Sequence, residues 1–346
     1  MAYSTIDKHT DYFNTKLWTG TSDATTTVSG VGFQPDFTWI KNRTVADDHA
    51  IFDSVRGVQK VLFSNGANAE STNTESLTAF NSDGFVTGNH RGTGGDAGNA
   101  MVSWNWKAGT TGSGYTTGSG TSKSYSYSVN TTAGFSIIKY TGNGTSGHTI
   151  PHHLGVAPKI VLIKKTSNAD SWSMLNTNIN LNYYLKLNGS DAQVNDALFN
   201  NTAPSTTVFT VDSDGQVNEN ANEFIAYCFT EVIGYSKFGS YTGNNGKNFI
   251  YTGFKPKWCM FKRTESADNW KILDSARSTY NIMNKTVGAD NSGAEGTESD
   301  VYVDFLSNGI RLDGTNGAIN ANGGDYIYMA FGQSIVGSNN VPCTAR

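Results

Sequence analysis

The chain has 346 residues and a formal net charge of −4, and 16% of its residues are charged, against about 25% in an ordinary soluble protein. Lysine and arginine are scattered and outnumbered by acids, which argues against a nucleic-acid-binding face, because phosphates need a concentrated basic surface. No apolar run is long enough for a membrane-spanning helix, and residues 1–16 lack the apolar core of a secretory signal. Aromatic residues make up 12% of the chain, which favours a folded protein.

A pattern led by proline occurs three times along the chain. The segments GFQPDFTWIKN, GVAPKIVLIKK and GFKPKWCMFKR begin at Gly32, Gly155 and Gly253. Aligned on the proline, each copy carries a lysine at the same distance, and further along an Asp or Asn. The repeated positions are Pro35, Lys41 and Asp53; Pro158, Lys164 and Asn176; and Pro256, Lys262 and Asp274. Self-similarity of this kind indicates a tandem repeat of one structural unit.

The flanks of the three copies agree as well. A Thr-Gly pair precedes each copy, and an aromatic-rich run closes each at 101–106, 224–229 and 326–331. We therefore expect module 1 at 1–107, module 2 at 133–235 and module 3 at 236–346. The Gly/Ser/Thr-rich segment 108–132 is interpreted as a flexible linker or an extended surface ribbon. Modules 2 and 3 are then expected to form a rigid pair, with module 1 more loosely attached.

The local pattern predicts strands in every copy. The runs FTWIKN, KIVLIKK and KWCMFKR are short, apolar and rich in β-branched or aromatic residues. The proline opens each run, where a missing N–H is tolerated best. Short strands separated by Gly-rich turns are typical of sandwiches and barrels. The expected fold is all-β, with three tandem β-sandwich modules of the jelly-roll or lectin-like type.

The repeated carboxylates raise the question of catalysis. Glycosidases use paired carboxylates, and Asp53 and Asp274 could supply one each. Asn176 holds the same position in module 2 and cannot act as a general acid, so a turn acceptor is the preferred interpretation. The repeated lysines Lys41 and Lys164, with Lys262, are interpreted as structural residues whose stems cover apolar surface. No catalytic residue and no enzyme activity are expected.

Metal and thiol chemistry are weakly indicated. His148, His152 and His153 lie in one segment and could gather as ligands if the loop folded back. No Cys or acid completes a set within the segment, so a surface loop is preferred, and neither a metal nor another cofactor is expected. The three cysteines lack a CxxC spacing and are expected to be buried reduced thiols.

Exposed aromatic rings are the natural candidates for contact with sugars. The tryptophans within the apolar runs are expected to pack in the core. The rings in polar surroundings, which are better candidates for contact with a host-surface glycan, are Trp18, Tyr115, Tyr125 and Tyr127.

The segments YFNTKLWTG, GVGFQPDFTWIKNR, HAIFDSVRG, SLTAFNSDGF and VSWNWKAG resemble a module common in virion proteins of tailed bacteriophages, especially marine ones. Module 1 matches closely over 1–107, whereas modules 2 and 3 match in pattern alone. The resemblance implies a β-sandwich virion component of the tail-fibre or uncharacterised structural type, without an established active site.

Three functions follow as hypotheses. The favoured one is a tail-fibre or receptor-binding protein, a homotrimer that contacts a host cell-surface glycan or protein and other virion proteins, and that assembles into the virion in the bacterial cytoplasm. The alternative is a capsid decoration or head-fibre protein, and a remote alternative is a polysaccharide depolymerase. Neither nucleic-acid binding nor membrane insertion is expected.

Overall fold

The proline-led runs form strands β3 (Phe37–Asn42), β15 (Ile160–Lys165) and β23 (Phe254–Arg263) in the computed structural model, which describes residues 4–336. Each pairs antiparallel with the aromatic-rich strand that closes its own copy. These partners are β9 (Ala100–Trp106), β20 (Glu223–Phe229) and β29 (Asp325–Ser334). The structure confirms the expected all-β class.

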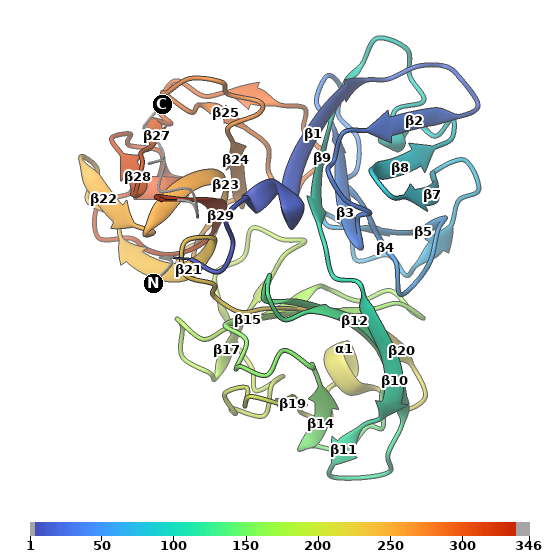
Figure 1. Cartoon of the computed structure of the whole chain (residues 1–346). Helices are drawn as coiled ribbons and strands as arrows, with labels where there is room; N and C mark the ends of the chain where they lie inside the picture. Colours follow the sequence, from blue (N-terminus) through green and yellow to red (C-terminus); the bar gives the residue numbers. More distant parts are fainter. Residues whose placement is uncertain (1–3, 337–346) are drawn as a thin grey trace.

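The strands fall into three lobes (Figure 1). Lobe 1 (β1–β9) has a six-stranded sheet in the order β1-β9-β3-β4-β5-β6 and a three-stranded sheet β2-β8-β7. Its remaining strands are β1 (Phe13–Thr19), β2 (Thr26–Ser29), β4 (Ala50–Asp53), β5 (Lys60–Phe63), β6 (Ser71–Thr72), β7 (Leu77–Asn81) and β8 (Gly84–Thr87).

Lobe 2 (β10–β20) has an eight-stranded sheet in the order β10-β12-β13-β20-β15-β16-β17-β18 and a three-stranded sheet β11-β14-β19. Its remaining strands are β10 (Thr110–Tyr115), β11 (Thr117–Gly118), β12 (Ser124–Asn130), β13 (Phe135–Thr141), β14 (His148–Pro151), β16 (Ser173–Asn176), β17 (Tyr183–Lys186), β18 (Val194–Asn195) and β19 (Val208–Val211).

Lobe 3 (β21–β29) repeats this plan, with a sheet β21-β29-β23-β24, a three-stranded sheet β22-β28-β27 and a pair β25-β26. Its remaining strands are β21 (Ser236–Thr242), β22 (Asn248–Tyr251), β24 (Lys271–Asp274), β25 (Lys285–Thr286), β26 (Gly296–Thr297), β27 (Val303–Phe305) and β28 (Gly309–Leu312). The short helices of the chain are η1 (His9–Asp11), η2 (Arg91–Thr93), α1 (Gly215–Asn218) and α2 (Gly317–Asn320).

The sequence predicts a flexible linker or an extended surface ribbon at 108–132, and the structure corrects the first of these alternatives. The segment is a ribbon of strands, because β10 and β12 pair with each other and β12 pairs with β13, so that it extends the large sheet of lobe 2. Two glycines of β10 make this possible: a Cβ on Gly112 or Gly114 would lie within 3 Å of the rings of Tyr127 and Tyr125. The tyrosine rings therefore lie across the glycine backbone, which explains the Gly/Tyr content without invoking flexibility.

The three lobes share one central core. Along β20, alternate side chains face opposite sides, so that Ile225 and Tyr227 lie in the central core while Ala226 and Cys228 lie in the core of lobe 2 itself. The same alternation holds in β9 and β29, whose inward residues are buried among those of the other lobes. Because these strands are buried on both faces of their sheets, their sequences are almost continuously apolar.

Lobe 1 is consequently not loosely attached, which corrects a second expectation. Trp106 of lobe 1 packs edge-on against Phe229 of lobe 2 and against Trp258 of lobe 3, with ring centroids 6.4 and 5.6 Å apart. Lobe 1 thus contacts both other lobes as closely as they contact each other. Figure 1 shows the three lobes around this common centre, an approximate three-fold arrangement within one chain.

The repeated lysines join each lobe to the next. The ammonium of Lys41 donates to the carbonyl of Ser292 in lobe 3 (3.0 Å), that of Lys164 to Ala67 in lobe 1 (3.2 Å), and that of Lys262 to Ser190 in lobe 2 (3.0 Å). All three lysines are fully buried. The lysine is therefore repeated because each copy joins its own lobe to another, in a cyclic set of contacts. Covering apolar surface with the side-chain stem is only part of its role.

The segment before β1 packs against β29, the last strand of lobe 3, and so completes a closed ring of three lobes. The side-chain amide of Gln333 on β29 donates to the carbonyl of Asp7 (2.7 Å), and its oxygen accepts from the backbone N–H of His9 (3.3 Å). Ile6, 2% exposed, inserts into the central core. The beginning of the described chain is thus part of the folded core.

Replacing Ile6 with alanine is expected to lower the free energy of unfolding by about 2–5 kcal/mol, because it leaves a cavity in the core that all three lobes share. Urea denaturation measures the change. Ile233, 73% exposed, provides the control, since its replacement with alanine should stay within about 0.5 kcal/mol of the wild type. Equal effects of the two changes would show that Ile6 is not packed as described.

Candidate functional site

The interface between lobes 1 and 2 contains a buried ion network. The carboxylate of Asp53 accepts from the guanidinium of Arg56 (2.5 Å) and from the hydroxyl of Tyr227 in lobe 2 (2.7 Å). Arg56 also donates to Glu70 (3.2 Å) and is 1% exposed at its side chain. The network fills the space between the two lobes, and each buried charge has a partner, as buried charges require.

The interface between lobes 3 and 1 repeats this network. Asp274 accepts from Arg277 (2.5 Å) and from the indole N–H of Trp104 in lobe 1 (3.0 Å), and Arg277 donates to Glu295 (3.1 Å). Arg43 of lobe 1 also binds Glu295 with two hydrogen bonds. Burial alone would raise the pKa of Glu295, but the hydrogen bond from Arg43 and the charge of Arg277 lower it. The two arginines on Glu295 therefore favour its charged form.

The interface between lobes 2 and 3 lacks every charge of this network. Asn176 stands where the other lobes have aspartate, Ile179 where they have arginine, and Gln193 where they have glutamate. The donor from the next lobe is also lost, because Met329 occupies the place of Tyr227 and Trp104 in the strand register. The four changes occur together, so they describe one altered interface and not four separate substitutions.

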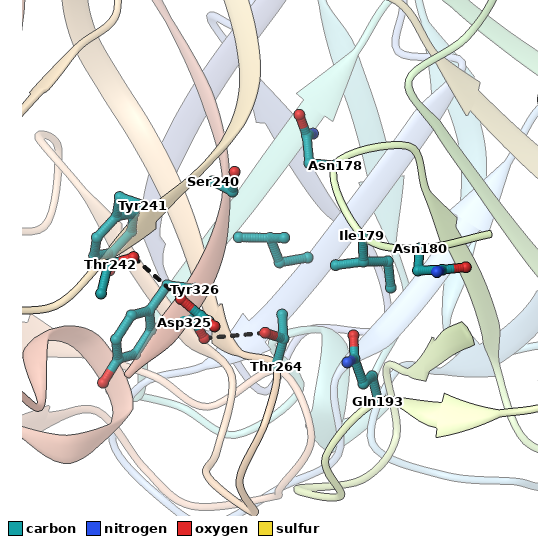
Figure 2. A pocket seen from close by; sticks show the side chains of 11 residues that line it. Asn178, Ile179, Asn180, Gln193, Ser240, Tyr241, Thr242, Thr264, Asp325 and Tyr326 are labelled. Atoms are coloured by element: carbon teal, nitrogen blue, oxygen red, sulfur yellow. Dashed lines mark hydrogen bonds between the residues drawn. The ribbon is translucent and has the colours of Figure 1, made fainter. Parts of the chain in front are cut away.

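A cleft of about 490 Å³ opens at this interface. Its volume lies in the range of about 300–1,000 Å³ found for ligand sites. Figure 2 shows Asn178, Ile179 and Asn180 of lobe 2 facing Ser240 and Thr242 of β21 across it. The full lining is Asn178, Ile179, Asn180, Gln193, Ser240, Tyr241, Thr242, Thr264, Asp325, Tyr326 and Ile327.

The charge of the cleft is also distinctive. In lobe 2, Lys139 and Glu223 form an ion pair (3.1 Å) at the positions that Ser240 and Asp325 occupy in lobe 3. The cleft therefore keeps a carboxylate, that of Asp325, but not the lysine. Asp325 accepts from the Thr242 hydroxyl (3.1 Å), and its backbone carbonyl accepts from the Thr264 hydroxyl (3.1 Å), as Figure 2 shows.

The side chains of Tyr241 and Tyr326 point away from the cleft, to the face of the sheet that packs against α2 (Figure 2). The rings of Tyr241 and Tyr326 stack on each other with centroids 5.0 Å apart. Their hydroxyls donate to the carbonyls of Ile319 and Gly317 in α2, at 2.5 and 2.6 Å. These contacts hold the paired strands that carry Ser240, Thr242 and Asp325.

The arrangement suits binding better than acid–base chemistry. The second carboxylate near the cleft is that of Glu265, which accepts from the backbone N–H of Asp325 (2.9 Å). Burial alone would raise the pKa of Glu265, but the hydrogen bond from Arg263 lowers it, whereas a general acid needs a raised pKa. The carboxylates singled out from the sequence, Asp53 and Asp274, are fully buried in the networks above, beyond the reach of a polymer.

The structure separates the four aromatic residues predicted to contact glycans. Tyr115 is 73% exposed, whereas Trp18 is half-buried and packs against Phe85 with centroids 5.7 Å apart. Tyr125 is 9% exposed and Tyr127 is half-buried, so these two belong to the packing of lobe 2. None of the four lines the cleft.

The three histidines predicted as speculative metal ligands do not converge. The rings of His148 and His152 are buried and contact the carbonyls of Ser119 (3.0 Å) and Ser205 (3.1 Å). His153 instead stacks on a tyrosine ring of β12, and burial lowers the pKa of all three histidines. Within residues 4–336 no group of three His, Cys, Asp or Glu side chains could hold a metal ion.

The cysteines in the described part of the chain lie in the protein core. Cys228 and Cys259 are buried and free, as expected, and burial raises the pKa of both thiols; Cys343 lies outside the described residues.

Over 4–336 no helix is long and apolar enough to span a bilayer.

The sequence contains a signal for the cleft outside the motifs considered above. The aligned copies read Arg56, Ile179 and Arg277 at one position, and the loss of a charge there marks the altered interface. What the alignment could not show is that Gln193, Ser240 and Asp325 meet at the same place.

Comparison with known proteins places the whole ring in one family. A family model described as a domain of unknown function, DUF7483, matches residues 8–334, a range that includes all three lobes. Searches of the curated proteins and of the solved structures found no match. The chain belongs to the DUF7483 family.

Proposed function

We propose that this chain is a non-catalytic, glycan-binding component of a bacteriophage virion, a tail fibre or receptor-binding protein that contacts the host surface through the cleft between lobes 2 and 3. The observation that carries the proposal is the concerted loss of Asp, Arg and Glu at this one of three equivalent interfaces. Neutral residues replace them at Asn176, Ile179 and Gln193, and a cleft replaces the buried network.

The lining matches the chemistry of a sugar. The amides of Asn180 and Gln193 and the hydroxyl of Ser240 supply donors and acceptors for sugar hydroxyls. Ile179 and Ile327 supply apolar surface against which the C–H face of a pyranose ring can pack. A small number of placed polar groups over an apolar floor is the usual design of a ligand site.

The virion setting rests on the resemblance of module 1 to phage structural proteins. A rigid ring of lobes is a suitable carrier for a binding site at an interface. The expected partners are other virion proteins and the host glycan. Trimerisation of the chain stays a prediction, although one chain already contains a three-fold arrangement of lobes.

Rebuilding the missing network should abolish binding. The triple variant Asn176→Asp, Ile179→Arg, Gln193→Glu places an arginine and its two carboxylate partners at the altered interface, as at the other two, and the arginine side chain would fill the cleft. Binding to an array of bacterial surface polysaccharides is expected to fall at least a hundredfold while the thermal midpoint is retained.

Thr27→Ala on the exposed face of β2 is the matched control and should bind as the wild type does. A triple variant that keeps its thermal midpoint and still binds would place the glycan elsewhere and refute the assignment of this cleft.

A capsid decoration protein is the second candidate, because an approximate three-fold arrangement of lobes (Figure 1) matches a local three-fold position on a capsid lattice. Copy number distinguishes the two. Quantitative mass spectrometry of purified particles should give a small multiple of three or six for a tail protein, and tens to hundreds for a decoration protein.

A further inference from the structure

We infer that the cleft between lobes 2 and 3 selects neutral, hexose-type glycans, which it holds through a pair of neighbouring hydroxyls on the carboxylate of Asp325, and that it rejects acidic polysaccharides. The inference rests on the proposed glycan-binding function and adds to it the chemical class of the sugar.

The carboxylate of Asp325 has capacity for a ligand. Among the described residues it forms no ion pair, and it accepts a hydrogen bond from the Thr242 hydroxyl at 3.1 Å. An ionised carboxylate has about four lone-pair sites, so most of them remain open toward the cleft. Two neighbouring sugar hydroxyls match the two oxygens of a carboxylate, each donating one hydrogen bond.

At the equivalent position in lobe 2 the carboxylate is already occupied. There Glu223 is paired with Lys139 at 3.1 Å, and the added strand β12 covers the same edge. In lobe 3 the lysine is replaced by Ser240, and within residues 4–336 no strand is added beyond β21. The acceptor is therefore left free at the one lobe where the neighbouring interface also opens.

The cations near the cleft are already engaged. The guanidinium of Arg263 binds Glu265 (2.6 Å) and Asp268 (3.3 Å). The buried ammonium of Lys262 donates to the carbonyls of Ser190 (3.0 Å) and Asp268 (2.7 Å). The lining itself contains no lysine or arginine. An acidic sugar would therefore meet the charge of Asp325 without a cation to neutralise its own.

The remaining polar groups are neutral. Asn180 is exposed and Gln193 is half-buried, so these two amides can turn toward a bound hydroxyl, whereas the amide of Asn178 is held by the side chain of Asn176 (2.9 Å) and the carbonyl of Phe238 (3.1 Å). An amide both donates and accepts hydrogen bonds. It therefore binds sugar hydroxyls, but it binds those of neutral and acidic sugars alike. Selection between the two classes consequently depends on Asp325.

The test is binding of the full chain to an array that carries neutral hexose oligosaccharides beside uronic-acid, sialylated and sulfated ones, at low ionic strength. Neutral glycans are expected to bind at least tenfold more tightly than every acidic class. Asp325→Asn, which preserves the shape of the side chain, should weaken the neutral ligand at least tenfold. Ser240→Lys should do the same by recreating the pair that Lys139 and Glu223 form.

The outcomes separate the inference from the proposed function. Preference for an acidic class, lost in the triple variant that fills the cleft, would overturn the inference and leave glycan binding intact. Neutral binding that Asp325→Asn and Ser240→Lys leave unchanged would also overturn it. No binding to any class on an array that represents bacterial surface sugars would overturn both.

Discussion

Replacing Asp274 with alanine is expected to lower the free energy of unfolding by about 3–5 kcal/mol, the usual result of removing one partner of a buried ion pair. The change leaves the guanidinium of Arg277 buried beside Glu295 alone, and the side chain of Arg277 is 0% exposed. It also removes the acceptor of the Trp104 indole N–H. Urea denaturation followed by tryptophan fluorescence and circular dichroism measures the loss.

The repeat supplies the matched control for this experiment. Asn176 holds the equivalent position in lobe 2, where Ile179 replaces the arginine, so no buried charge is abandoned when Asn176 becomes alanine. The side-chain oxygen of Asn176 accepts from the backbone of Asn178 (2.9 Å), and its loss should cost only about 1–2 kcal/mol. Equal losses at the two positions would show that the ion networks do not hold the lobes together.

Stability is expected to rise with pH between about pH 8 and pH 9.5. Burial lowers the pKa of Lys41, Lys164 and Lys262 from 10.5 to about 8 in the folded protein. In this window the unfolded chain holds three protons that the folded chain releases, and stability rises with pH wherever the unfolded state binds more protons. Each lysine contributes up to about 1.4 kcal/mol per pH unit.

Two buried thiols oppose this trend. Burial raises the pKa of Cys228 and Cys259, so that near pH 9 the unfolded chain loses thiol protons that the folded chain keeps. Two opposing groups are outweighed by three lysines in this window. Above about pH 10 the buried tyrosines, whose pKa burial also raises, add to the thiols, and the rise should end.

Lys262→Met isolates the lysine contribution from the thiol and tyrosine background. The lysine part of the pH slope should fall by about a third in this variant, and thermal midpoints recorded from pH 7.5 to 9.5 for both proteins provide the comparison. Parallel curves for wild type and variant would mean that Lys262 does not change its protonation in this range. Because the pKa is lowered in the folded state, the buried charge of the lysine destabilises the protein fully below about pH 8. This destabilisation decreases as the lysine loses its proton at higher pH.

Much of the fold could be read from local pattern. Strands β3, β15 and β23 and their partners β9, β20 and β29 lie where the proline-led and aromatic-rich runs predicted them, because alternation and β-branched content are properties of a few consecutive residues. The buried tryptophans of these runs follow for the same reason. One of the two alternatives for 108–132, the flexible linker, is wrong, because the glycines of β10 are needed where the rings of Tyr125 and Tyr127 cross them.

The candidate site lay beyond that kind of inference. Local sequence established the class of the fold, the three copies of the pattern and the odd position of Asn176. It could not establish that the copies close around a common core, since contacts between residues more than a hundred positions apart, such as Tyr227 with Asp53, leave no local periodicity. The cleft exists because three charge losses, the loss of one donor and the carboxylate of Asp325, all distant in the chain, meet at one interface when the three lobes pack together.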